Sequence, residues 1–159
     1  MKAKKATESV WDYPRPPRVE ASAERIVLRF AGRVILDTTS SYRVLETSHP
    51  PTYYLPKRDL IEGVLEPVRG TSYCEWKGAA RYFDIVLDGG RAERAAWEYA
   101  EPRKGYEMLA GHISIYAAHM EAVYVDDERI EAQEGDYYGG WISSNVRGPF
   151  KGGPNSVGW

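Results

Sequence analysis

The chain has 159 residues, of which 43% are hydrophobic and 28% charged; this composition fits one globular domain and excludes a wholly disordered chain. Its formal net charge of −2 argues against a general nucleic-acid-binding protein, because binding to phosphates requires a clear excess of basic residues. No apolar run approaches the length that spans a bilayer, and no apolar stretch follows the basic start as it does in a secretory signal. We therefore expect neither membrane insertion nor export.

A single cysteine, Cys74, limits the chemistry further. One thiol cannot form an internal disulfide, and zinc sites built on two or four cysteines are excluded. The lack of disulfides, together with the missing secretory signal, predicts a cytoplasmic protein.

Residues 1–23 are predicted to form an extended arm. Three of the four residues at 14–17 are prolines, which disfavour a helix and favour an extended path. Trp11 and Tyr13 give this arm apolar surface, so we expect it to dock across the domain. The β-rich core is predicted to span residues 24–132, and residues 133–159, rich in glycine and tryptophan, are expected to form a second docked arm.

Strand signals begin at residue 24. Branched and aromatic residues fill positions 25–30 and 33–37 on either side of a turn, which predicts a hairpin. Another strand is predicted at 42–46, in which Arg43 faces one side and Glu46 the other. A short extended piece follows at 53–55, and Asp59 is expected to cap a helical turn. The pattern leaves residues 60–68 open.

The longest strand-like region runs from residue 72 to 87, and Gly78 in its middle predicts a bulge or a loop. A hairpin turn is predicted at 88–90, whereas residues 92–99 fit either a helix or a strand. Further strands are predicted at 113–116 and 122–125, with a bend or helical turn between them. The chain is therefore predicted to be mostly β, a small antiparallel barrel or a two-layer β domain with short helical turns and docked N- and C-terminal arms.

Four phrases of the sequence occur in an order that resembles one protein family. They are SHPPTYYLP at residues 48–56, CEWKGAARY at 74–82, AWEYAEP at 96–102 and VYVDDE at 123–128. The resemblance is to the domain-of-unknown-function 427 family; it covers roughly residues 25–129, and the arms are similar to those of its longer members. It implies a compact β-rich domain with no settled activity, and the family has carried a nucleotidyltransferase label.

The residues do not favour that label. Polymerase-like nucleotidyltransferases hold Mg²⁺ with spaced aspartates that follow a Gly-Ser pair, because two metal ions clamp the phosphates. This chain has no Gly-Ser dipeptide, and Asp126 and Asp127 are adjacent, so on a strand they would point to opposite faces. We predict no metal site, and the sequence names no cofactor.

Lys77 and Gly78 are the first site candidates. A lysine beside a glycine in an otherwise aromatic region favours a recess that binds an anion through the ammonium and nearby backbone N–H groups. Alternatively, Lys77 reaches water and Gly78 marks only a bulge. Glu46 and Lys77 are the predicted catalytic residues, Glu46 as an acid/base or as a partner of Lys77, and Arg43 offers a planar fork for carboxylate or phosphate. Separate surface charges are the alternative for Arg43 and Glu46.

Aromatic residues supply the walls of this predicted recess. The chain has 12 tyrosines and 5 tryptophans but only 3 phenylalanines, and tyrosine and tryptophan suit half-wet surfaces. Core packing and strand propensity are the alternative explanation. The residues predicted to stack on a ring-bearing ligand are Tyr53 or Tyr54, Tyr82, Trp97, Tyr99 and Tyr116.

Cys74 and the three histidines provide a weaker signal. The spacing of Cys74, His49, His112 and His119 matches no known zinc pattern. A nucleophilic Cys74 would need a base such as His49 close in space, which spacing alone does not show.

Three classes of function follow from these residues. The predicted one is a module that binds a small anionic or ring-containing ligand in an aromatic-lined pocket. The second is an enzyme that uses Glu46 or Cys74 with Lys77 in the same pocket. The third is a protein-interaction module whose arms bury against a partner subunit in a homo-oligomer.

Overall fold

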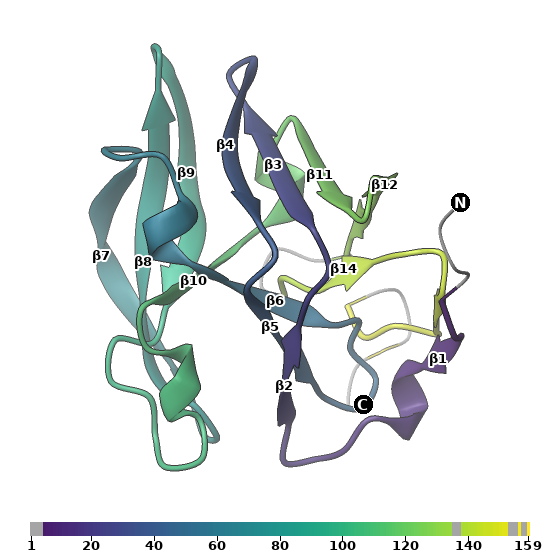
Figure 1. Ribbon diagram of the computed structural model, residues 1–159. Coiled ribbons are helices and arrows are strands. Elements are labelled where there is room, and N and C mark those ends of the chain that lie inside the picture. The colour runs from purple at the N-terminus through teal and green to yellow at the C-terminus, as the bar shows by residue number, and fades with distance from the viewer. Residues whose placement is uncertain (1–4, 135–137, 153–155, 157–158) are drawn as a thin grey trace.

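A computed structural model describes residues 5–134, 138–152, 156 and 159 (Figure 1). The largest sheet has seven strands, in the spatial order β2 (Arg18–Ser22), β5 (Ser41–Leu45), β6 (Thr52–Pro56), β10 (His112–Ile115), β9 (Gly90–Glu98), β8 (Gly78–Leu87) and β7 (Leu65–Cys74). A four-stranded sheet has the order β12 (Glu128–Arg129), β11 (Ala122–Val125), β3 (Ile26–Phe30) and β4 (Arg33–Thr38). All the strand pairs in these two sheets are antiparallel.

Two short pairs of strands and four helical turns complete the described fold. β1 (Glu8–Ser9) pairs with β15 (Val146–Arg147), and β13 (Glu131–Ala132) pairs with β14 (Trp141–Ile142). The helical turns are all of the 3₁₀ type: η1 (Val10–Asp12), η2 (Lys57–Asp59), η3 (Glu107–Leu109) and η4 (Ala117–His119). The prediction of a mostly β chain with short helical turns is confirmed. Over the described residues the sheets do not close into a barrel, because β2 and β7 remain the two edges of the seven-stranded sheet.

The hairpins predicted around residues 31–32 and 88–90 are confirmed as β3–β4 and β8–β9. The strand-like region predicted at 72–87 is interrupted next to Gly78, where a bulge or a loop was predicted, since β7 ends at Cys74 and β8 begins at Gly78. Gly78 has φ +112°, a backbone conformation that other residues avoid, and this allows the chain to reverse. Residues 92–99, for which the sequence allowed a helix or a strand, lie almost entirely within the strand β9, where Ala95 and Ala96 are buried.

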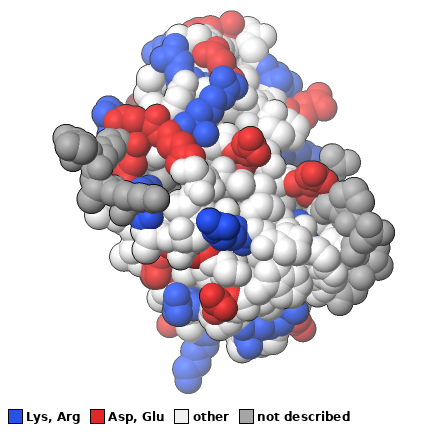
Figure 2. Space-filling view, turned by 90° about the vertical axis from the view of Figure 1, so that its right-hand side faces the viewer, with Lys and Arg blue, Asp and Glu red and all other residues white. Residues whose placement is uncertain are grey.

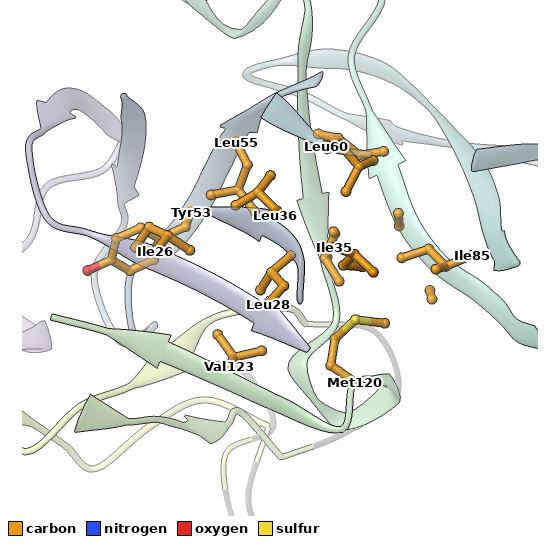
Figure 3. Packing of buried hydrophobic residues seen from close by; sticks show 14 of the residues in the cluster. Ile26, Leu28, Ile35, Leu36, Tyr53, Leu55, Leu60, Ile85, Met120 and Val123 are labelled. Atoms are coloured by element: carbon orange, nitrogen blue, oxygen red, sulfur yellow. The ribbon is translucent and has the colours of Figure 1, made fainter. Parts of the chain in front are cut away.

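The main core lies where the two larger sheets meet (Figure 3). Leu28 of β3 and Leu36 of β4 contribute to it from the four-stranded sheet, and Leu55 of β6 and Ile85 of β8 contribute from the seven-stranded sheet. A second buried cluster uses the alternate positions of the same large sheet. Its members are Val44, Tyr54, Ala80, Tyr82, Trp97, Tyr99, Tyr106 and Leu109.

The two terminal segments dock, as predicted, and they contact each other. β1 runs parallel to β15, and Trp11 Nε1 donates a hydrogen bond of 2.9 Å to the carbonyl oxygen of Pro149. The rings of Trp11 and Trp159 meet edge to face at 5.2 Å. Trp141 enters the main core and stacks on Tyr53 with ring centroids 4.9 Å apart. Aromatic residues of both arms therefore have contacts within one chain.

Charged side chains of both signs are interspersed over the face of the molecule turned to the viewer in Figure 2. Over the described residues, no helix has the length and apolar character that crossing a membrane requires.

Shortening Leu55 should destabilise the fold strongly. The Leu55 side chain is fully buried in the main core, so Leu55→Ala removes apolar contacts and leaves a cavity. We expect the free energy of unfolding to fall by about 2–5 kcal/mol in a urea titration. Val34→Ala on the exposed side of β4 is the control and should change it by no more than about 0.5 kcal/mol. Equal small effects of both variants would contradict this description of the core.

Candidate functional site

A cavity of about 440 Å³ opens beside the second cluster, where the β7–β8 turn meets β5, β6 and β9. Segments from four parts of the chain line it: the large sheet with the residues that directly follow β9 and β10, the loop between β5 and β6, the turn at residues 75–77, and the C-terminal segment from residue 133 onward. The lining residues are Val44, Glu46, His49, Thr52, Tyr54, Ser72, Tyr73, Cys74, Glu75, Trp76, Lys77, Tyr82, Trp97, Tyr99, Tyr116, Gln133, Tyr138, Gly139 and Lys151.

Lys77 brings a buried positive charge to this cavity. The residue is only 8% exposed, and its ammonium lies 5.6 Å from the centroid of the Tyr99 ring. Over the described residues, no carboxylate lies within ion-pair distance of it. Burial by itself would lower the pKa of Lys77, but the nearby Tyr99, Cys74 and Glu46 outweigh burial and raise it. Lys77 is therefore a cation at neutral pH.

Gly78 fixes the position of Lys77 and does not itself line the cavity. The N–H of Arg103 donates a hydrogen bond of 2.9 Å to the carbonyl oxygen of Lys77. A Cβ at position 78 would lie 3.3 Å from Cγ of Arg103, which is tighter than ordinary contact. Glycine thus permits both the positive φ and the close approach of residues 101–103 that holds the turn.

Four of the predicted aromatic residues form one continuous wall. Trp97 is central: its ring lies 4.5 Å from that of Tyr116, and its Nε1 donates a 3.4 Å hydrogen bond to the Tyr54 hydroxyl. The Tyr54 ring in turn lies 6.2 Å from that of Tyr99. Burial raises the pKa of Tyr54, so its hydroxyl stays protonated. Of the two tyrosines proposed at 53–54, Tyr54 lines the cavity and Tyr53 belongs to the main core.

Tyr82 lies at a different part of the same wall. Its hydroxyl is 2.7 Å from Oγ of Ser72, and the guanidinium of Arg94 covers its ring at 4.1 Å. Both contacts hold the phenol in place, so one face of the ring is occupied by protein.

Glu46 lines the cavity, whereas Arg43 does not. Arg43 projects from the other face of β5, where its Nη2 is 2.6 Å from Glu8 and its Nη1 is 2.9 Å from Glu20. It therefore ties the N-terminal segment to the sheet. Glu46 is held by Arg15, with Nη2 to Oε2 at 3.2 Å. The structure brings Glu46 and Lys77 to one cavity and leaves Arg43 outside it.

His49 is a neutral group on the cavity wall. The pKa of its imidazole is lowered to about 4, first because burial disfavours the charged form and second because Lys151, Arg15 and Lys77 repel it. Its Nδ1 is 3.3 Å from Nε2 of Gln133, and its Nε2 is 3.9 Å from Oε2 of Glu46.

The C-terminal segment crosses the cavity at Tyr138 and Gly139 and separates it from a second one of about 240 Å³. Gly139 lies directly on the Trp97 ring, and a Cβ there would overlap it. Tyr138 packs edge to face on His49, with ring centroids 5.0 Å apart. Glycine at 139 is therefore the residue that lets this segment close over the aromatic wall.

Cys74 and His49 share the cavity, whereas His112 and His119 do not line it. The latter two pack against the rings of Tyr42 and Tyr116. Within the described ranges, no group of three His, Cys, Asp or Glu side chains is placed to hold a metal ion. Asp126 and Asp127 form the β11–β12 turn, with both residues at positive φ, where the Asp126 carboxylate accepts the Arg25 N–H.

Sequence reasoning missed the part of the site that comes from the C-terminal segment. Gln133, Tyr138 and Lys151 line the cavity, although they lie 56 or more positions after Lys77. No local pattern marks these residues, because their role arises only when the segment folds back on the sheet. The glycine pair at 139–140 was the one available sign of a close approach.

The chain belongs to the family described as a domain of unknown function, DUF427 (NTP_transf_9), whose model matches residues 18–126. This confirms the resemblance seen in the sequence. No curated protein compared with the chain matches it. The matched region includes Glu46, Lys77 and Trp97. Arg15 and the cavity-lining residues of the C-terminal segment lie outside it.

His49 should make the protein less stable in mild acid. Between pH 6.5, the ordinary pKa of histidine, and pH 4, the unfolded chain binds a proton that the folded chain does not. The free energy of unfolding therefore rises with pH across this window, and acidification through it should cost up to about 3 kcal/mol. Urea titrations across this range should show the loss in the wild type and a flatter profile in His49→Gln.

His119→Gln is the control for this measurement, because it removes an exposed imidazole outside the cavity. It should keep the wild-type profile. A His49→Gln profile identical to that of the wild type would contradict the burial of a neutral imidazole at this position.

The contact between Gly139 and Trp97 can be tested by a double-mutant cycle. Gly139→Ala should lower the free energy of unfolding by about 1–3 kcal/mol, because the added methyl collides with the indole. Trp97→Phe removes the part of the ring that Gly139 approaches, so the double variant should be less destabilised than the sum of the single effects. Strict additivity in urea unfolding would show that the two residues do not touch.

Proposed function

We propose that the protein binds a small organic anion that carries a planar ring, in the cavity lined by Lys77, Tyr54, Trp97, Tyr99 and Tyr116. The observation that carries this proposal is a buried ammonium at an aromatic-lined cavity, with no carboxylate of the described residues within ion-pair distance of it. A volume of about 440 Å³ falls within the range of small-molecule sites in proteins.

The treatment of other buried charges in this chain supports the proposal. Glu98 is 1% exposed and has two cations, with Lys57 Nζ at 2.7 Å and Arg81 Nη2 at 2.6 Å. Asp84 is buried as well, and Arg91 lies 2.6 Å from it. Burying a charge without a counter-charge is costly. The fold pairs both of these carboxylates with cations, whereas Lys77 has no carboxylate within ion-pair distance among the described residues, and this favours an external anion for Lys77.

The aromatic wall supports the proposal that the ligand carries a planar ring. Tyr and Trp side chains offer flat apolar faces on which a ring can stack at little conformational cost. Trp97 and Tyr116 are held by their neighbours and by the sheet, so the surface is formed before a ligand arrives. The catalytic roles predicted for Glu46 and Lys77 stay predictions.

Replacing Lys77 should abolish binding of the acid without lowering the stability of the fold. Lys77→Met keeps the length of the side chain and removes the buried charge, so the unliganded variant should be at least as stable as the wild type. A thermal-shift panel of benzoate, indole-3-acetate and 2-naphthoate should raise the wild-type melting temperature by roughly 5–10 °C for an acid present at about 100 times its Kd. The variant should lose this response.

Lys104→Met, which changes an exposed lysine, is the matched control and should respond to the acids as the wild type does. An unchanged response in Lys77→Met, or no response of the wild type to any of the three acids, would refute the proposed site.

A further inference from the structure

The hydrogen bonds of Gln133 determine which atom of His49 carries a proton. Oε1 of Gln133 accepts the N–H of Gly140 at 3.0 Å, which fixes the orientation of the amide because a backbone N–H can only donate. Nε2 of Gln133 then donates to the carbonyl oxygen of Lys151 at 2.7 Å. The remaining hydrogen of the amide points to His49, whose Nδ1 lies 3.3 Å away.

An amide NH₂ group has no lone pair to offer, so Nδ1 of His49 has to be the acceptor in this contact. A neutral imidazole carries one proton, and that proton therefore sits on Nε2. The imidazole cannot act as a base through Nδ1, because Gln133 occupies that lone pair. The group that remains available for a ligand is the Nε2–H donor.

His49 lines the cavity, and its Nε2–H has no partner in hydrogen-bond range among the described residues. Oε2 of Glu46 lies 3.9 Å from this nitrogen, beyond hydrogen-bond distance. Glu46 is itself engaged by Arg15, which compensates its charge. A ligand that reaches this wall thus meets an N–H donor.

Three cations act on His49, although the carboxylates of Glu46 and Glu75 also line the cavity. Lys77 and Lys151 line the same cavity, and Arg15 lies beside Glu46. These cations oppose protonation of His49, which keeps it a neutral donor, and the same field attracts an anion. A donor next to a cation is the arrangement that binds an ionised oxygen acid, because such a group accepts hydrogen bonds and donates none.

We propose that His49 is a specificity-determining residue, whose Nε2–H, fixed by Gln133, selects a ring-bearing carboxylate over the corresponding neutral amide. This inference rests on the proposed function and assigns to His49 a second contact with the anionic group of the ligand. A neutral amide has one accepting oxygen where a carboxylate has two, and its NH₂ cannot accept from the His49 donor. It would also leave Lys77 without a counter-charge.

The first test compares acids with their amides. Binding of benzoate, indole-3-acetate and 2-naphthoate is measured by calorimetry against benzamide, indole-3-acetamide and 2-naphthamide. The wild type should bind at least one acid about tenfold or more tightly than its amide. His49→Phe keeps a planar ring against Tyr138 and should reduce acid affinity by about tenfold with little change for the amide.

The second test needs no variant. Nitrogen-15 NMR of the wild-type protein at neutral pH should show a protonated Nε2 and an unprotonated Nδ1 for His49. A proton on Nδ1, alone or in addition, would overturn the inference even if acids bind.

The outcomes separate the two proposals. Acid affinity that is unchanged in His49→Phe would overturn the role of His49 and leave anion binding at Lys77 intact. Acids and amides that bind equally well to the wild type would overturn selection of the anion by His49 and by Lys77 together. Failure of all six compounds to bind would overturn the proposed function and this inference with it.

Discussion

The fold depends on strands that bury large side chains on both of their faces. Consecutive residues of a strand point to opposite sides of a sheet. In β6, Tyr53 and Leu55 therefore enter the main core, and Tyr54 between them enters the second cluster. β9 does the same with Ala96 and Trp97. Because both sides are fixed by packing, a shift of register by one residue would disrupt the core and the aromatic wall together.

Burial on both faces of the large sheet fixes the side chains that line the cavity. One face of the large sheet is anchored by the four-stranded sheet, so the opposite face can carry an incompletely filled aromatic cluster. The β7–β8 turn then places Lys77 over that face, and Gly78 permits the tight reversal that keeps it there. Packing of the main core on one face of the large sheet stabilises the fold. The opposite face, which carries the cavity, is available for a site.

The C-terminal segment supplies one wall of the cavity. Gln133 contacts His49, Gly139 lies on Trp97, and Lys151 adds a second cation. These residues follow the region matched by the DUF427 family model, whereas the sheet that they cover lies within it. The polarity of the site is thus set by contacts between the family domain and the segment after it.

The sequence by itself determined the family, the mostly β class, the hairpins β3–β4 and β8–β9, and Lys77 and the tyrosine and tryptophan residues as site candidates. Turn chemistry and residue type are local, so these features can be read without a fold. Only the tertiary structure decided that Arg43 holds the N-terminal segment, that the bulge or loop predicted at Gly78 is a reversal of the chain, and that Gln133 reaches His49. Each of these depends on contacts between residues distant in the chain, or on one backbone angle, which local patterns do not encode.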